Sequence, residues 1–65
     1  MKIKVNGEFL TDFSGNINEL LQKQNLSPDR VAVEYNGQIL SRENFNNVSL
    51  KDGDTVEIVH FVGGG

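Results

Sequence analysis

Two Asn-Gly dipeptides constrain the fold of this chain more than any other feature of its sequence. Asn-Gly best tolerates the positive φ angles of a type I′ turn, which joins two antiparallel strands. Asn6-Gly7 and Asn36-Gly37 each follow a segment that alternates polar and apolar residues, as half-buried strands do. The sequence therefore predicts two β-hairpins. Their strands are expected at residues 2–6, 8–13, 31–35 and 38–40.

The second strand of the first hairpin is the least regular of the four. Phe9 and Leu10 are adjacent and both apolar, so they break the period of two that a half-buried strand shows. Either side chain can face the core. The register of this strand therefore stays open at the level of the sequence.

One helix is expected between the hairpins. Asn16 can cap its start by accepting a backbone N–H bond, and Glu19 is placed three residues later to reach back, as in a capping box. The helix should end near Gln24, because Asn25 can take the left-handed conformation and Pro28 cannot continue a helix. The residues that share its apolar face are Ile17, Leu20 and Leu21.

A final strand is expected after a strong turn signal. Residues 42–45 should first form a short helical turn that brings Phe45 inward. The sequence KDGD at 51–54 then predicts a turn, and a strand should run from Thr55 to about Val62. Alternation divides the side chains of that strand between one face, with Val56 and Ile58, and the other, with Glu57, Val59 and Phe61.

The order of these elements is hairpin, helix, hairpin and final strand. One helix can cover two hairpins only if they join one sheet, and right-handed connections then place the final strand in the centre, parallel to the first. This is the α+β arrangement called the β-grasp, or ubiquitin-like, fold: a mixed sheet of four to five strands packed on one helix. We expect residues 1–62 to form this domain and residues 63–65 to form a flexible tail.

Composition excludes several classes of function. The chain has 65 residues, and a domain of this size buries only about 60% of the surface of its unfolded form, so a deep private active site is not expected. Without cysteine it has no thiol nucleophile and no zinc-thiolate site. No residues with the spacing of metal ligands occur, and no metal site is predicted.

Charge and hydropathy indicate the setting in which the chain works. The net charge is -3 and the six basic residues are scattered, which argues against binding to nucleic acid or to an anionic membrane. No apolar segment approaches the roughly 20 residues that span a bilayer, and the N-terminus lacks the apolar core of a signal peptide. We expect a cytoplasmic protein that is a monomer when free.

The sequence ends in three glycines, Gly63-Gly64-Gly65, directly after the predicted final strand. Glycine has the largest entropy cost of ordering, so we expect this segment to extend beyond the sheet, and without Cβ atoms it can thread a narrow channel. The carboxylate of Gly65 is an anion near neutral pH and resists nucleophiles. A partner that uses ATP and Mg could convert it to an acyl-adenylate, after which a sulfur donor could leave a thiocarboxylate. This chain has no phosphate-binding loop of its own.

The chain resembles the ThiS family of ubiquitin-related sulfur carriers over essentially its whole length. The segments that carry the resemblance are MKIKVNG at 1–7, RVAVEYNG at 30–37, KDGD at 51–54 and VEIVHFVGGG at 56–65, the last being the most specific. The resemblance implies a β-grasp fold and a role as protein-bound sulfur donor of thiazole formation in thiamine biosynthesis, rather than as an enzyme.

The same resemblance implies partners and site residues. An E1-like adenylyltransferase of the ThiF type would adenylate Gly65, a persulfide enzyme would supply sulfur, and a thiazole synthase of the ThiG type would receive it. Gly63 and Gly64 would form the arm inserted into partner active sites. We expect Val59 and Phe61 to dock partners on the sheet face opposite the helix, and Arg42 to contact a partner's acidic residue, although an ordinary solvated arginine is the simpler interpretation.

Two other functions use the same C-terminal glycine. One is the related carrier that serves as the small subunit of molybdopterin synthase, and the other is a ubiquitin-like modifier joined to target lysines. Among the remaining side chains, His60 has no placed partner for proton transfer, so a surface or packing role is expected. Asp52 and Asp54 flank Gly53 and indicate turn chemistry rather than a catalytic carboxylate pair.

Overall fold

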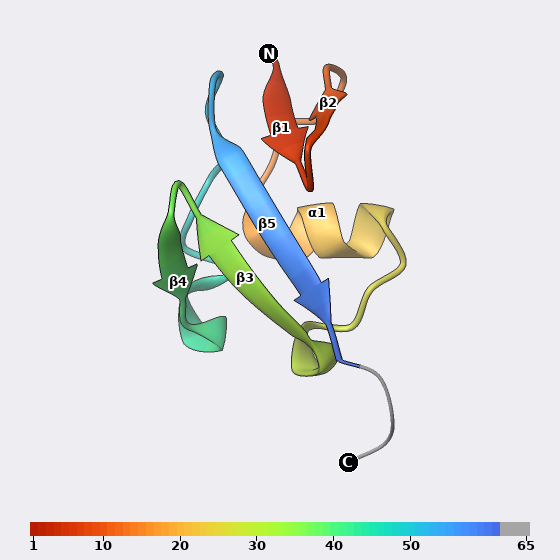
Figure 1. Ribbon diagram of the computed structural model, residues 1–65, viewed down its shortest axis with the longest axis vertical. Helices are drawn as coiled ribbons and strands as arrows, with labels where there is room; N and C mark the ends of the chain where they lie inside the picture. The colour runs from red at the N-terminus through yellow and green to blue at the C-terminus, as the bar shows by residue number, and fades with distance from the viewer. Residues whose placement is uncertain (62–65) are drawn as a thin grey trace.

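The computed structural model describes residues 1–61, and these form one sheet with one α-helix across it (Figure 1). Two short 3-10 helices, η1 and η2, complete the described part of the chain. In chain order the elements are β1 (Ile3–Val5), β2 (Glu8–Leu10), α1 (Ile17–Lys23), η1 (Pro28–Arg30), β3 (Val31–Tyr35), β4 (Gln38–Leu40), η2 (Arg42–Asn44) and β5 (Thr55–His60). The expected boundary between residues 62 and 63 lies outside the described residues.

β5 occupies the centre of the sheet, as predicted. The strand order is β2-β1-β5-β3-β4, with β5 parallel to β1 and antiparallel to β3. In register, Val56 of β5 pairs with Val5 of β1, and Ile58 pairs with Val33 of β3. The described residues therefore have the mixed sheet and single helix of the β-grasp arrangement.

Both hairpin turns have the backbone that Asn-Gly favours. The φ angles are 50° and 85° at Asn6 and Gly7, and 49° and 87° at Asn36 and Gly37. Consecutive positive φ angles define the type I′ turn, whose twist matches that of the flanking strands. The prediction of two hairpins is confirmed.

The second strand is shorter than expected, and its register is now defined. Leu10 pairs with Ile3 and is half-buried, whereas Phe9 points to the other face and is 61% exposed. The prediction of a strand through Phe13 was wrong beyond Leu10. The chain leaves the sheet there because Phe13 turns into the core, where it is 7% exposed.

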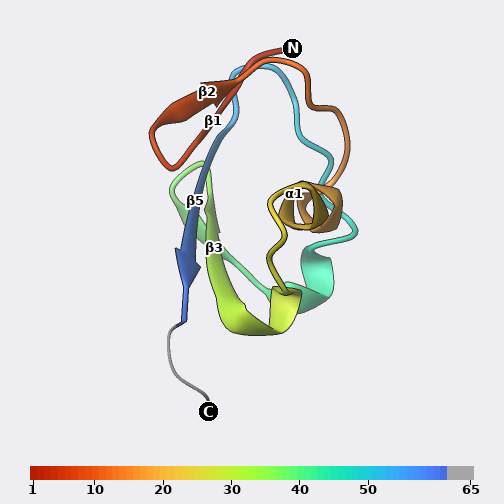
Figure 2. The same cartoon turned by 90° about the vertical axis from the view of Figure 1, so that its right-hand side faces the viewer.

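The helix begins and ends as its capping residues predict. Asn16 Oδ1 accepts a hydrogen bond from Glu19 N at 2.9 Å, and Glu19 Oε1 accepts one from Asn16 N at 2.8 Å, which completes the capping box. At the other end Asn25 has a φ of 59°, and Leu26 N donates to Leu21 O at 2.9 Å. Figure 2 shows α1 lying across one face of the sheet.

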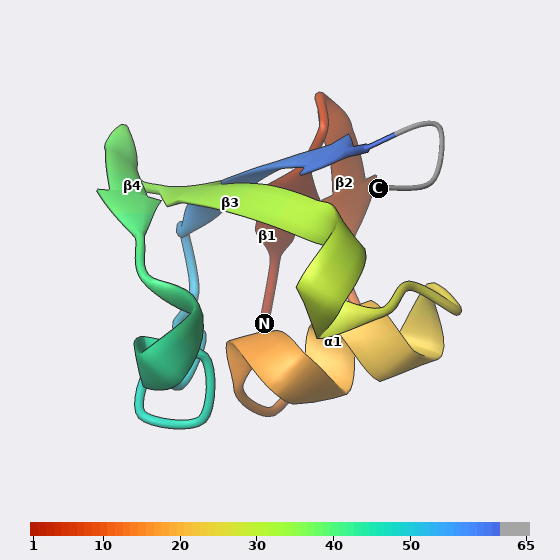
Figure 3. The ribbon, with the colours of Figure 1, turned by 90° about the horizontal axis from the view of Figure 1, so that it is seen from below.

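The core lies between that face and the helix. The view from below shows α1 and η2 on the same side of the sheet, and no element among residues 1–61 covers the other side (Figure 3). We call this uncovered side the outer face. The buried apolar side chains are Ile3, Val5, Phe13, Ile17, Leu20, Leu21, Val31, Val33, Phe45, Leu50, Val56 and Ile58.

Within residues 1–61, α1 is far too short and too polar to cross a bilayer, and neither 3-10 helix could do so. The same residues contain no group of three or more side chains placed to hold a metal ion.

Candidate functional site

Gly63, Gly64 and Gly65, the residues predicted to present and carry sulfur, lie outside the described residues. What the structure defines is the strand that leads to them. On one side β5 pairs with β3, from Val56 opposite Tyr35 to His60 opposite Val31. Phe61 N extends this pairing by donating a hydrogen bond to Arg30 O at 2.8 Å. The chain is therefore fixed to the sheet up to Phe61.

The Asn6 side chain holds the other side of β5 where β1 ends. The last paired residues of these two strands are Val5 and Val56. Two residues further along β5, Asn6 Oδ1 accepts a hydrogen bond from Ile58 N at 2.6 Å, and Asn6 Nδ2 donates to Ile58 O at 3.1 Å. A side-chain amide carries one acceptor and a donor group, so it can take the place of a peptide unit. Asn6 thereby extends β1 by one pairing step.

Val59 and Phe61 lie on the outer face, as the alternation of β5 predicts. Their side chains are 60% and 50% exposed, whereas Val56 and Ile58 on the opposite face are 0% and 8% exposed. Ala32 of β3 pairs directly with Val59 and is half-buried. The outer-face position is confirmed, and docking of a partner there stays a prediction.

Three further side chains share the outer face and were not singled out from the sequence. Glu34 of β3 pairs with Ile39 of β4 on one side and with Glu57 of β5 on the other. All three are exposed, and Ile39 is 72% exposed. Alternation in 31–35 and 55–62 places each glutamate outward. That Glu34 and Glu57 lie opposite each other follows only from the register between β3 and β5, which are distant in sequence.

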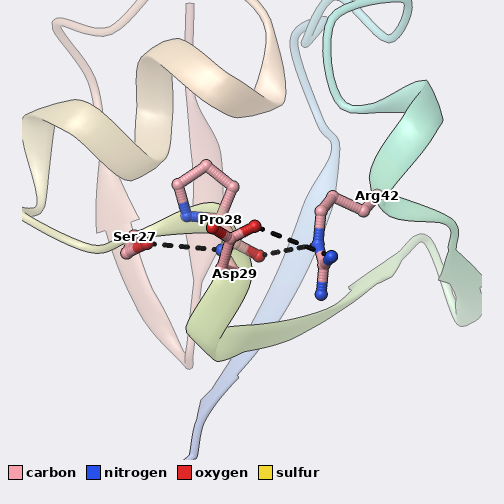
Figure 4. A network of polar contacts seen from close by, with 4 residues as sticks. All are labelled: Ser27, Pro28, Asp29 and Arg42. Carbon is pink, nitrogen blue, oxygen red and sulfur yellow. Dashed lines mark hydrogen bonds and ion pairs between the residues drawn. The ribbon is translucent and has the colours of Figure 1, made fainter.

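Arg42 contacts η1 rather than solvent alone (Figure 4). Its Nε donates a hydrogen bond to Pro28 O at 3.2 Å, and its Nη1 lies 3.6 Å from Asp29 Oδ1. The ion pair is exposed, so it contributes little to stability. These contacts join η2 to the segment before β3, and the predicted contact of Arg42 with a partner is not tested by them.

Asp54 is the best-connected carboxylate in the described residues. It is 7% exposed and accepts hydrogen bonds from Tyr35 Oη at 2.7 Å, Asn36 Nδ2 at 3.1 Å and Lys51 N at 2.8 Å. Burial alone would raise the pKa of Asp54, but the hydrogen bonds from Tyr35, Lys51 and Asn36 outweigh it and lower that pKa. The same bond to Asp54 is the main reason why the pKa of Tyr35 is raised.

Asp52 and Asp54 do not form a carboxylate pair. Asp52 Oδ1 accepts a hydrogen bond from Lys2 N at 2.7 Å, so the two carboxylates serve different partners on either side of Gly53. Gly53 has a φ of 89°, which a tight turn requires and glycine adopts without strain. The prediction of turn chemistry is confirmed.

His60 is an exposed residue at the end of β5, where it pairs with Val31. Within residues 1–61 its side chain makes no hydrogen bond or ion pair that would orient it for proton transfer. The described geometry gives it no catalytic partner.

The chain is similar to proteins of known family along almost its entire length. A sequence model described as the ThiS family matches residues 3–65. The sulfur carrier protein ThiS of Bacillus subtilis is 46% identical over 52 residues, which cover 80% of this chain and 79% of that protein. A thiazole synthase of Magnetococcus marinus is 42% identical over 66 residues. That match covers all of this chain but only 20% of the thiazole synthase, so the chain spans about a fifth of its length.

Solved structures show the same fold. The crystal structure of a thiamine biosynthesis protein, ThiS, from Geobacter metallireducens superposes on this chain with a TM-score of 0.82 and 43% sequence identity. The comparison covers 100% of both chains. A solution structure of a thiamine biosynthesis protein from the same organism gives a TM-score of 0.80 at 42% identity and covers 100% of this chain and 88% of that one.

Proposed function

Because this chain belongs to the ThiS family, we propose that it is the sulfur carrier of thiazole formation in thiamine biosynthesis and that Gly65 carries the sulfur. The observation that carries the proposal is the family match over residues 3–65, which includes all three C-terminal glycines. The described structure supports it, because the β5 strand that leads to those glycines is fixed to the sheet on both sides. The match to this family also favours thiazole formation over the molybdopterin branch.

The proposed chemistry takes place at the Gly65 carboxylate and in partner active sites. The carboxylate attacks the α-phosphate of ATP, pyrophosphate leaves, and an acyl-adenylate forms. A persulfide on a partner enzyme then attacks the glycyl carbon through its outer sulfur and AMP leaves, which gives an acyl disulfide. A partner thiol attacks the inner sulfur of that acyl disulfide, so the thiocarboxylate leaves and the two partner sulfurs remain joined as a disulfide. Gly63 and Gly64 present no Cβ atoms, so the segment can pass through a narrow entrance to the site where this occurs.

The partner supplies ATP and Mg in this proposal, and the chain itself acts as a carrier rather than an enzyme. It contains no cysteine, so it cannot hold the persulfide, and residues 1–61 offer no cluster of metal ligands. We assign adenylation to an E1-like adenylyltransferase of the ThiF type. We further propose that the chain works in the cytoplasm and is a monomer when free.

Thiazole synthase is the proposed acceptor of the sulfur. The Magnetococcus marinus thiazole synthase contains a stretch that corresponds to this whole chain and occupies a fifth of its length. A carrier joined to the protein that uses it supports direct delivery. In the present chain the outer-face side chains Val59 and Phe61 are proposed to dock these partners, and Arg42 to contact an acidic residue of one of them.

Intact-mass spectrometry tests the function directly. The chain incubated with the adenylyltransferase, ATP, Mg, a persulfide donor and a thiol reductant should gain the mass of one sulfur-for-oxygen exchange. A variant that lacks Gly65 should not gain it. Its circular dichroism and melting temperature should stay unchanged, because Ile58, the last core residue of the described part, lies seven positions before Gly65. A matched Lys23→Ala variant, changed at the exposed end of α1, should load like the natural chain.

Two outcomes would contradict the proposal. A chain without Gly65 that still gains sulfur would place the acceptor elsewhere. Conjugates of higher mass, formed through lysines of other proteins, would instead indicate a ubiquitin-like modifier. Transfer of the sulfur from the loaded chain to thiazole synthase, and not to molybdopterin synthase, would complete the assignment.

A further inference from the structure

The centre of the outer face holds two glutamates directly opposite each other. Glu34 of β3 and Glu57 of β5 are paired in register, and both side chains are exposed. Like charges directly opposite each other on one sheet face destabilise the pairing of the strands. The fold therefore keeps an unfavourable pair at its most central strand contact, although neither position requires a charge for packing.

Neither glutamate forms an ion pair with a basic side chain of residues 1–61. The ion pair found among residues 1–61 joins Arg42 to Asp29, away from either glutamate. Lys4 of the neighbouring strand β1, and Lys2 just before it, lie over an aromatic ring instead: their Nζ atoms are 5.3 Å and 4.3 Å from the centroid of the Phe9 ring. A cation from outside the described residues can therefore bind here without displacing one.

Two exposed apolar side chains lie close to the glutamates on the outer face. Across the sheet the order is Ile39, Glu34, Glu57. Two residues further along β5 towards Gly65, on the same face, lies Val59, which pairs with Ala32. Ile39 and Val59 are 72% and 60% exposed. A pair of carboxylates beside exposed apolar side chains matches an arginine. Its planar guanidinium binds carboxylates with two parallel hydrogen bonds, and its stem packs on apolar atoms.

We propose that Glu34 and Glu57 are the anionic centre of a docking surface for an arginine on the adenylyltransferase that activates Gly65. The inference rests on the function proposed above and names the chemistry by which that partner is recognised. Arginine is enriched among the residues that dominate binding at protein interfaces. Glu57 is part of β5, so a partner that binds it holds the strand that leads to Gly65. Gly65 lies eight positions further along the chain, which span at most roughly 28 Å.

The test uses the opposite effects expected on stability and on binding. Glu57→Lys converts the repulsive pair into an attractive one, so the melting temperature should rise by about 1–5 °C. The same change should weaken binding to the purified adenylyltransferase by about tenfold or more at low salt, because an arginine of the partner would meet a lysine. Glu34→Gln and Glu57→Gln should each weaken binding by about threefold to tenfold without a loss of stability.

A control for Glu34→Gln and Glu57→Gln makes the same change of net charge at a distant position. Glu43 is an exposed glutamate of η2, which lies on the helix side of the sheet, so Glu43→Gln should leave the dissociation constant within about twofold. Binding by the natural chain should also weaken as salt rises, and the Glu57→Lys variant should lose that dependence in part.

The possible outcomes separate this inference from the proposed function. If the natural chain gains no sulfur when incubated with the adenylyltransferase, ATP, Mg, a persulfide donor and a thiol reductant, the proposed function is contradicted, whatever the variants do. If the natural chain gains sulfur and Glu57→Lys binds the adenylyltransferase equally well, the docking inference alone is overturned. Loss of binding together with a lower melting temperature would also overturn it, because the glutamates would then act by holding the sheet. Weakened binding to thiazole synthase but not to the adenylyltransferase would assign the surface to another partner and refute the stated one.

Discussion

Asp54 illustrates how a single side chain can fasten a turn to the rest of the molecule. Its carboxylate accepts hydrogen bonds from the Tyr35 hydroxyl, the Asn36 amide and the Lys51 backbone, which together connect the end of the second hairpin to the start of β5. The sequence predicts the turn itself, because KDGD is a local signal. It does not predict the three donors, since two of them come from residues about twenty positions earlier.

Replacing Asp54 by Asn should destabilise the fold and change its response to acid. The hydrogen bonds to a charged acceptor are lost, and we expect the free energy of unfolding to fall by about 1–3 kcal/mol at neutral pH. The pKa of Asp54 is lowered by folding from its ordinary value of 3.8, so its stabilising effect is present above that value and is lost as the pH falls through the lowered pKa of the folded state.

Urea unfolding from neutral pH down to about pH 2 measures both effects. The Asp54→Asn variant should start lower and lose less stability on acidification than the natural chain. Tyr35→Phe is the companion variant, because it keeps the carboxylate and removes one donor, and it should show an intermediate acid response. Parallel acid curves for all three proteins would show that Asp54 does not contribute in this way.

Elements whose signals are local could be predicted closely from the sequence. The helix α1 has its cap, its partner at Glu19 and its left-handed terminator within ten residues, so the expected bounds agree with the observed ones. The two hairpin turns agree for the same reason. The end of β2 does not agree with the prediction. It depends on the burial of Phe13 against residues distant in sequence, which the alternation of polar and apolar residues does not indicate.

β5 shows the same limit within one element of the candidate site. Alternation alone separates Val56 and Ile58 from Val59 and Phe61, and the structure confirms this division. The opposition of Glu57 to Glu34 and the hydrogen bonds from Asn6 depend on strand register, which the sequence leaves open. The face on which each residue of a strand lies can therefore be predicted from the sequence, but the residues of neighbouring strands that lie opposite it cannot.

Two truncations on β5 should separate docking from packing. Phe61→Ala removes a side chain that is 50% exposed, so partner binding should weaken more than the melting temperature falls. Ile58→Ala, on the opposite face and 8% exposed, should instead cost about 2–5 kcal/mol of stability by leaving a cavity. Thermal melts and titration with the adenylyltransferase measure both quantities. The reverse ranking for Phe61 would place it in the core.

At the scale of the whole molecule, the small core leaves little stability in reserve. A chain of 65 residues is expected to have a free energy of unfolding of roughly 3–10 kcal/mol. The buried apolar residues form one cluster between α1 and a single face of the sheet. Loss of one large side chain from that cluster therefore removes a substantial fraction of the total.

Phe45 and Phe9 provide a matched pair for testing this. Phe45 is 2% exposed, so Phe45→Ala should lower the free energy of unfolding by about 3–5 kcal/mol. Phe9 is 61% exposed on the outer face, so Phe9→Ala should change stability by less than about 1 kcal/mol. Circular dichroism and urea unfolding distinguish the two. Similar losses for both variants would mean that the outer face contributes as much as the core.

The hydrogen bonds of Asn6 also tie the fold to the chemical ageing of the chain. An asparagine that precedes glycine is prone to lose its amide, because the next backbone nitrogen can close a succinimide ring on the side chain. The aspartate formed on hydrolysis would set an oxygen against Ile58 O, where the amide now donates at 3.1 Å. At Asn36 the same change would bring a second negative charge against Asp54. Stored protein should therefore become less stable first around the central strand. Species whose mass is raised by one deamidation should have a lower melting temperature than fresh protein.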